Sequence, residues 1–244
     1  MNDFLIVIPA RYQSSRFPGK PLADINGKSM IQHVWDKCVE VASSDKVVIA
    51  TDDNRIYKHC KSQKMKVLMT SNKCHTGTDR TYEVALKIRA EYYINVQGDE
   101  PLISPEDIQT VIKASKEKSL ITINAMCPIE NESDFNNTNI PKVVTKEDGS
   151  LLYISRAPIP SNKELSFRKA MKQVCIYAFP RKVLLSFGSY KKKTQLEAIE
   201  DIEILRLLEL GYDVKMIEVS DSSVAVDTPE DLSKVTSIIN EKSS

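Results

Sequence analysis

The sequence predicts an α/β protein with a mostly parallel, Rossmann-like central sheet and a smaller antiparallel insertion. In the first hundred residues, short apolar runs rich in β-branched residues alternate with segments of helical periodicity. Such alternation forms right-handed βαβ units, in which the strands are parallel. After residue 120 the pattern changes, because strands follow one another and Asp148-Gly149 is a strong hairpin signal.

Local sequence patterns predict alternating strands and helices in the first half of the chain. An apolar run at residues 5–8 predicts a buried strand that ends at Pro9. Further strands are predicted at 46–51, 66–70 and 92–96. Helices are predicted at 30–41, 56–62, 82–90 and 106–116.

The second half contains more strands than helices. Strands are predicted at 121–129, 142–145, 151–155, 174–179 and 214–219. The stretch 157–171, rich in Pro, Ser and Lys, is predicted to be a mobile loop.

Two helices are predicted near the C-terminus. The clearer one spans 196–210 and ends before Gly211; its apolar face is formed by Leu196, Ile199, Ile202, Leu205 and Leu208. Its Glu-rich face, with Glu197, Glu200 and Glu203, is interpreted as solvated surface. The other helix begins at Thr228-Pro229, where the acids at 230 and 231 suit a first turn.

The composition argues against several classes of function. The 244 residues are 41% hydrophobic and 27% charged, which is ordinary for a globular protein. A net charge of +1 argues against a broad nucleic-acid or membrane surface. We find no membrane-spanning run or signal peptide. Five scattered cysteines fit reduced thiols, and three histidines show no metal spacing. We therefore expect a cytoplasmic protein.

A basic loop follows the first strand. It carries Arg11, Arg16 and Lys20 among small residues, which lets cations and backbone approach a phosphate. The loop matches neither Gly-x-Gly-x-x-Gly nor the P-loop. From composition alone, a solvated surface loop is the alternative.

Two aspartates occur where ligands bind in α/β proteins. Asp99 comes directly after a predicted strand, and Asp227 precedes the last helix. Both could hold Mg²⁺ on a phosphate, or could simply form a turn or cap a helix. Two carboxylates facing three cations are what nucleotidyl transfer requires.

Several motifs occur together along the chain. They are Pro-Ala-Arg-Tyr-x-Ser-Ser-Arg-Phe-Pro-Gly-Lys-Pro-Leu at 9–22, Thr-Gly-Thr-Asp-Arg at 76–80, Asn-Val-Gln-Gly-Asp-Glu-Pro at 95–101, and shorter elements at 142–144, 155–157, 176–177 and 226–232. This set closely resembles the 3-deoxy-manno-octulosonate (Kdo) cytidylyltransferases, or CMP-Kdo synthetases. Enzymes that activate sialic acids share a looser form of the first motif.

The resemblance implies roles for individual positions. The CTP phosphates would be bound by Arg11, Ser14, Ser15, Arg16 and Lys20, of which Arg16 and Lys20 would steady the departing pyrophosphate. The cytosine and ribose pocket would be lined by Ala10, Thr76, Gly77 and Thr78. Mg²⁺ would be held by Asp99 and Asp227. The sugar acid would be faced by Arg80, Gln97, Lys142, Tyr153, Ser155 and Arg156.

The resemblance also implies an activity and an organisation. CMP would pass from CTP to a 3-deoxy-2-keto sugar acid, with Kdo the leading acceptor, in a Mg²⁺-dependent homodimer. We expect a single nucleotidyltransferase domain over 1–244. Its nucleotide-binding part would span about 1–118, a sugar-binding and dimerisation insertion about 121–195, and a return to the core about 196–244.

Two positions depart from the family pattern on the acceptor side. Gln173 stands where the family usually has His, and Ile204 stands where it usually has Gln. Losing a buried donor changes which sugar hydroxyls can be paired, and this alters specificity. A different acid sugar, such as a modified octulosonate or a sialic-type acid, is therefore one alternative. Another is a nucleotide-binding regulator that has lost catalysis.

Overall fold

The computed structural model describes residues 2–14, 16–117, 120–220 and 224–243, so Ser15 lies outside the described residues. Its strands are β1 (Asn2–Ala10), β2 (Asp24–Ile25), β3 (Lys28–Ser29), β4 (Val47–Thr51), β5 (Val67–Met69), β6 (Ala90–Val96), β7 (Thr122–Pro128), β8 (Lys142–Thr145), β9 (Leu151–Ser155), β10 (Met171–Pro180) and β11 (Val214–Glu218). Its α-helices are α1 (Met30–Val41), α2 (Asn54–Ser62), α3 (Gly77–Lys87), α4 (Pro105–Glu117), α5 (Glu132–Asn136), α6 (Arg181–Ser189), α7 (Gln195–Glu200), α8 (Leu205–Glu209) and α9 (Pro229–Ser243).

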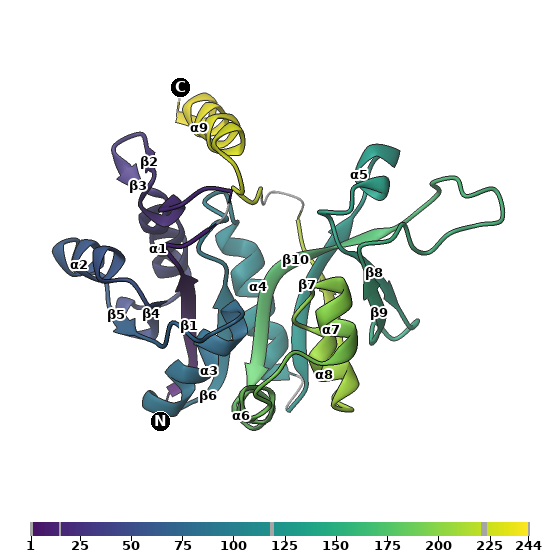
Figure 1. Ribbon diagram of the computed structural model, residues 1–244, viewed down its shortest axis with the longest axis horizontal. Helices are drawn as coiled ribbons and strands as arrows, with labels where there is room; N and C mark the ends of the chain where they lie inside the picture. The colour runs from purple at the N-terminus through teal and green to yellow at the C-terminus, as the bar shows by residue number, and fades with distance from the viewer. Residues whose placement is uncertain (1, 15, 118–119, 221–223, 244) are drawn as a thin grey trace.

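The central sheet has the strand order β11-β7-β10-β6-β1-β4-β5 (Figure 1). Strand β1 is parallel to both β4 and β6, β4 is parallel to β5, and β7 is parallel to β11. Strand β10 runs antiparallel between β6 and β7. The predicted mixed α/β fold, with a mostly parallel sheet and a small antiparallel pair, is confirmed.

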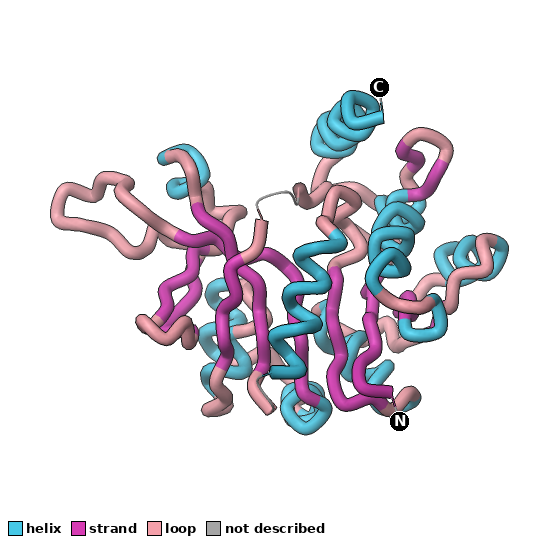
Figure 2. The backbone as a smooth tube through the Cα atoms, turned by 180° about the vertical axis from the view of Figure 1, so that it is seen from behind, coloured by secondary structure: helices cyan, strands magenta, loops and turns pink. Residues whose placement is uncertain are grey.

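Helices cover both faces of the sheet. Along β1, Ile6 and Ile8 enter the core beneath α1 and α4, whereas Leu5 and Val7 enter the core beneath α3 and α6. Figure 2 views the sheet from the side of α1 and α4. Because β1 is buried on both faces, its sequence reads as a continuous apolar run, as expected for a central parallel strand. None of the helices formed by the described residues is long and apolar enough to span a membrane.

Two strands assigned to the antiparallel insertion lie elsewhere. The segments 121–129 and 174–179 correspond to β7 and β10, which belong to the central sheet. Their side chains are buried on both faces there, which satisfies their apolar composition. Outside that seven-strand order, β8 and β9 form the antiparallel hairpin with the predicted turn, where Gly149 has φ +82°. The following loop projects from the molecule (Figure 1).

The prediction of a single helix over 196–210 is wrong. The segment forms two short helices, α7 and α8, and Asp201 between them adopts a left-handed conformation with φ +51°. Ile199 is 71% exposed, whereas Glu197 is fully buried. The ion pair of Glu197 with buried Arg206 therefore overrides the apolar periodicity.

Several other boundaries also differ from the prediction. Helix α3 begins at Gly77, five residues before the predicted start at 82, because Thr76 and Asp79 form a capping box. Strand β6 begins at Ala90, which had been assigned to the helix. Helices α5 and α6 were not predicted.

Candidate active site

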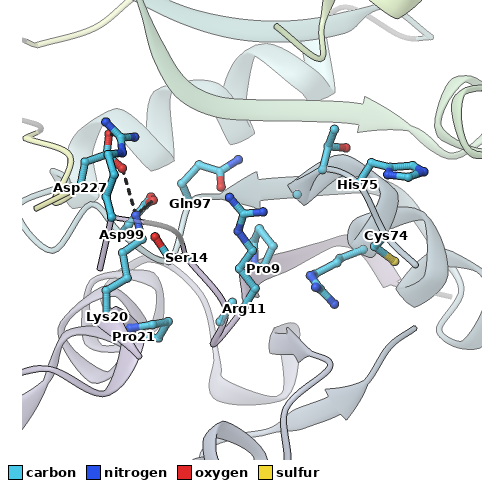
Figure 3. Close-up of a pocket in the computed structure, with 16 residues that line it drawn as sticks. Pro9, Arg11, Ser14, Lys20, Pro21, Cys74, His75, Gln97, Asp99 and Asp227 are labelled. Atoms are coloured by element: carbon cyan, nitrogen blue, oxygen red, sulfur yellow. Dashed lines mark hydrogen bonds and ion pairs between the residues drawn. The ribbon is translucent and has the colours of Figure 1, made fainter. Parts of the chain in front are cut away.

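A pocket lies at the carboxyl ends of β1 and β6, where parallel sheets place ligands (Figure 3). Its walls come from the basic loop, the start of α3, the residues after β6 and the segment before α9. The predicted site residues that line it are Ala10, Arg11, Ser14, Arg16, Lys20, Thr76, Gly77, Arg80, Gln97, Asp99 and Asp227. The structure thus brings together the predicted cations and carboxylates.

Lys20 joins both acidic residues at one end of the pocket. Its Nζ lies 2.7 Å from Oδ2 of Asp99 and 3.2 Å from Oδ1 of Asp227, and it donates to the carbonyl oxygen of Val226 at 2.9 Å. Arg16 adds a contact of 2.9 Å to the other oxygen of Asp227. Burial alone would lower the pKa of Lys20, but the two carboxylates outweigh it and raise that pKa above its ordinary value. Lys20 is therefore a permanent cation at this position.

The basic loop is shaped by a tight turn before Lys20. Gly19 has φ +76°, and its backbone N donates to the carbonyl oxygen of Tyr12 at 2.8 Å. The Tyr12 ring lies against Gly19, where a Cβ would come within 2.9 Å of it. The guanidinium of Arg55 lies over the Tyr12 ring, 3.3 Å from the ring centroid. These contacts direct Lys20 toward the carboxylates.

Backbone contacts bring the two carboxylates together. Gly98 lies so close to β1 that an added Cβ would come within 2.7 Å of the carbonyl oxygen of Pro9. The next residue, Asp99, accepts a hydrogen bond of 2.9 Å at its carbonyl oxygen from the backbone N of Val226. This contact fixes Asp227 beside Asp99, although the two are far apart in the sequence.

The start of α3 forms another wall. Thr76 caps the helix, with Oγ1 accepting from the backbone N of Asp79 at 3.1 Å, and Gly77 lies close to Gln97. Figure 3 shows Cys74 and His75 at the end of the pocket away from Lys20. Thr78, predicted to line the nucleotide pocket, is instead fully buried behind this wall. Burial raises the pKa of the Cys74 thiol to about 12, with Glu83 adding to the shift, so that thiol is protonated at neutral pH.

Of the residues predicted to face the sugar, Arg80 and Gln97 line the pocket. Arg80 is only 4% exposed, and its Nη2 lies 2.7 Å from Oδ2 of Asp52. Its charge is therefore largely compensated within the protein. No local sequence pattern identifies this partner, because Asp52 follows a different strand.

The other residues predicted to bind the sugar acid lie on or beside β8, β9 and β10. In the described chain they are not part of the lining of this pocket. They are Lys142, Tyr153, Ser155, Arg156 and Gln173. Lys142 donates to two carbonyl oxygens, at 2.9 and 2.6 Å. Burial, with Arg156 nearby, lowers the pKa of Lys142. Gln173 donates to Oδ1 of Asn124 at 2.8 Å.

Two glutamates interpreted as solvated surface in fact make structural contacts. Glu200 accepts from the Ser155 hydroxyl at 2.6 Å and from the backbone N of Arg156 at 2.9 Å. Glu203 accepts from the backbone N of Thr78 at 3.1 Å. No sequence pattern identifies these contacts, because each joins segments distant along the chain.

The family model described as "Cytidylyltransferase" matches residues 5–217. The chain belongs to the cytidylyltransferase family. It is therefore a CTP-dependent nucleotidyltransferase, as its motifs predict.

Similar proteins support the same assignment over nearly the whole chain. The 3-deoxy-manno-octulosonate cytidylyltransferase of Escherichia coli is 39% identical over 239 residues, covering 98% of this chain and 97% of its own length. The protein of the same name from Geobacter sulfurreducens is 42% identical over 241 residues, with 94% and 96% covered. The resemblance found in the motifs is thus confirmed.

Two solved structures are similar to this cytidylyltransferase. A CMP:2-keto-3-deoxy-manno-octonic acid synthetase complexed with CTP has a TM-score of 0.92 and 38% identity, with 99% of this chain and 100% of that chain covered. The 4-diphosphocytidyl-2C-methyl-D-erythritol synthase of Anaerococcus prevotii has a TM-score of 0.65 and 14% identity, with 98% and 100% covered. This second likeness concerns the fold alone.

Proposed function

We propose that this cytidylyltransferase transfers CMP from CTP to the anomeric hydroxyl of Kdo and releases pyrophosphate. The observation that carries the proposal is the cluster of Arg16 and Lys20 with Asp99 and Asp227 inside one pocket. Such a cluster suits a polyphosphate accompanied by a metal ion. The names of the relatives, at about 40% identity, support CTP and Kdo as the substrates.

The cations would bind the triphosphate. Arg11, Arg16 and Lys20 line one pocket with Ser14, and they can compensate the charge of the phosphates and of the departing pyrophosphate. The resemblance adds Ser15 to this group. The cytosine and ribose would lie against Ala10, Thr76 and Gly77, with Thr78 supporting this wall from behind.

The donor set fits a divalent metal, which we propose to be Mg²⁺. Asp99 and Asp227 both face one cationic centre, the ammonium of Lys20, and both offer the hard oxygen ligands that Mg²⁺ prefers. The described residues hold no group of three or more ligating side chains. Phosphate oxygens and water would therefore complete the coordination, as is common for Mg²⁺ with nucleotides. When bound, the metal would neutralise phosphate charge.

The acceptor would approach from the side of β8 and β9. Gln97 and Arg80 line the pocket, and Lys142, Tyr153, Ser155, Arg156 and Gln173 are proposed, from the resemblance, to recognise the sugar acid. In the reaction, the anomeric oxygen bonds to the α-phosphorus while the bond from that phosphorus to pyrophosphate breaks, and the proton of the anomeric hydroxyl is released to solvent. No covalent enzyme intermediate is required, so the residues act by alignment and charge compensation.

We further propose a cytoplasmic homodimer. Within the predicted 121–195 insertion, β7 and β10 lie in the seven-strand order, so we expect the dimer contact to use α5, the β8–β9 hairpin, the projecting loop or α6. Among the cysteines of the described chain, Cys38 and Cys60 are buried thiols outside any disulfide, which fits a reducing compartment.

Pyrophosphate release with Mg²⁺ and CTP tests the proposal. The acceptors are Kdo, a sialic acid and amino- or deoxy-modified octulosonates, with UTP and ATP replacing CTP as controls. Release with CTP and Kdo is the expected result. Release only with another acid would assign a specificity change to Gln173 and Ile204, the positions that depart from the family pattern. Binding of CTP without release would indicate a regulator that has lost catalysis.

A further inference from the structure

The wall formed by the start of α3 is held from behind by a carboxylate. In Asp79, Oδ2 accepts hydrogen bonds from the backbone N of His75 at 3.1 Å and of Thr76 at 3.0 Å. Its other oxygen, Oδ1, accepts from Nη1 of Arg206 at 3.0 Å. Because His75 and Thr76 line the pocket, one side chain connects Arg206 to the pocket wall.

Several contacts hold the Arg206 side chain in place. Its side chain is 1% exposed, and its Nε and Nη2 donate to the two carboxylate oxygens of Glu197 at 2.7 and 2.6 Å. The guanidinium also stacks on Phe187, 3.8 Å from the ring centroid. Glu197 is itself fully buried, and a bidentate pair compensates the cost of burying both charges. These contacts leave Nη1 aimed at Asp79.

A second contact from the same segment supports this arrangement. Glu203, between α7 and α8, accepts from the backbone N of Thr78 at 3.1 Å. The first backbone donors of a helix have no partners inside the helix, so an oxygen acceptor beside them is favourable. Two side chains three residues apart, Glu203 and Arg206, therefore hold the first turn of α3, through Thr78 and Asp79 respectively.

We infer that Arg206 is a positioning residue for the nucleotide pocket of this enzyme. Acting through Asp79, it fixes the backbone of His75 and Thr76, against which the nucleotide would rest. Arg206 is outside the lining of the pocket, so its effect is indirect. The inference rests on the proposed function only in taking CTP as the nucleotide.

The variants Arg206→Lys and Asp79→Asn test this positioning role of Arg206. Lysine keeps the charge but cannot form the bidentate pair with Glu197 and also reach Asp79. In Asp79→Asn the pair of Arg206 with Glu197 stays intact. If the amide oxygen faces the donors of His75 and Thr76, the NH₂ group faces Arg206, and the connection is lost. This milder variant keeps the test valid if Arg206→Lys does not fold.

We expect both variants to weaken CTP binding. The Kd for CTP, measured by calorimetry, and the KM for CTP should each rise about tenfold. A small misplacement of a pocket wall can cost up to roughly a hundredfold in rate, so kcat/KM for CTP should fall by roughly ten- to a hundredfold. The KM for the acceptor should change less than about twofold.

Arg181→Lys is the matched control. Nη1 of Arg181 donates to the carbonyl oxygen of Ala85 at 2.5 Å and to the Tyr93 hydroxyl at 3.0 Å, and so holds the other end of α3. We expect this variant to lower Tm and to leave the Kd and KM for CTP unchanged.

Two outcomes separate the inference from the proposed function. If Arg206→Lys and Asp79→Asn lower Tm but leave the Kd for CTP at the wild-type value, Arg206 is only structural and the inference is wrong. If the wild-type protein binds CTP but releases no pyrophosphate with any acceptor, the proposed reaction fails. The Kd measurements would still test the inference in that case.

Discussion

Lys20 and Asp99 form a 2.7 Å ion pair that joins the loop after β1 to the end of β6. Asp227 lies 3.2 Å from the same ammonium, so one cation compensates two carboxylates. The Lys20 side chain is only 10% exposed, and such pairs are screened little by solvent. The pocket is therefore preorganised by its own charges before a nucleotide or a metal enters it.

Replacing Lys20 removes this compensation. In Lys20→Met two nearby carboxylates face each other without a cation, and the pyrophosphate loses a positive partner. Removing one charge-stabilising group typically costs roughly a hundredfold or more in turnover, and we expect that loss in kcat for pyrophosphate release. The control is Lys28→Met, because Lys28 is half exposed and pairs with Asp36 on the surface. Near-normal turnover in Lys20→Met would contradict the assigned role.

Asp99→Asn tests the metal site. The amide keeps the shape of the side chain but loses its charge, so the proposed Mg²⁺ ligand becomes weaker. We expect the Mg²⁺ concentration for half-maximal rate to rise, and kcat to fall by roughly a hundredfold, since Lewis-acid stabilisation is worth several kcal/mol. A titration of rate against Mg²⁺ measures both effects.

The Mg²⁺ titration also separates this role from the ion pair with Lys20. If the variant only disturbed that pair, kcat would fall without a change in the Mg²⁺ requirement. Asp36→Asn, a change on the surface, is the control and should leave both values unchanged. Near-normal turnover of Asp99→Asn would make the metal assignment wrong.

The grouping of cations and carboxylates in one pocket could be predicted from the sequence because its signals are local. Arg16 and Lys20 lie in one contiguous loop, and Asp99 directly follows a strand, so strand order alone brings them to one sheet edge. The packing behind the site could not be predicted in this way. Glu197 and Arg206 follow the spacing of an ordinary exposed helix, and their burial is explained by their ion pair together with the contact of Arg206 to Asp79.

The position of β10 illustrates the same limit at the level of the fold. Its apolar run predicts a strand, but the run does not say which strands flank it. Antiparallel pairing with both β6 and β7 requires the chain to return through the sheet after the β8–β9 hairpin. Such a return depends on contacts between segments that are distant in the sequence, which local patterns do not encode.

Gly98→Ala should damage the site through the backbone. A Cβ at this position would come within 2.7 Å of the backbone oxygen of Pro9, so β1 and the segment carrying Asp99 must separate. We expect an overpacking cost of about 1–3 kcal/mol in the free energy of unfolding, measured by urea denaturation, together with a loss of kcat.

Gly77→Ala provides the comparison for Gly98→Ala. A Cβ there would first meet the end of the Gln97 side chain at 3.0 Å, and a side chain can move more easily than backbone. We expect it to cost less stability than Gly98→Ala. Equal stability of the wild type and Gly98→Ala would show that the two segments are less tightly packed than described.

The carboxyl group of Glu203 predicts a pH-dependent change in stability. Burial raises its pKa above the usual value, with Asp79 adding to the shift and hydrogen bonds from Thr78 and Thr76 opposing it. The folded state then holds the proton more tightly than the unfolded state. The stabilisation from this proton is present below the unfolded pKa, and is lost as the pH rises through the folded pKa.

Glu203→Gln should therefore be more stable than the wild type at pH 7.5, because the amide carries no charge and its oxygen can still accept from the backbone N of Thr78. The difference in Tm should shrink as the pH falls below the usual carboxyl range, since the wild-type side chain is then also neutral. Glu203→Met, which is neutral but has no oxygen acceptor, separates the effect of charge from the hydrogen bond and should lack the gain. A wild type that is more stable than Glu203→Gln at pH 7.5, and equal to it in acid, would mean that the fold favours the charged carboxylate.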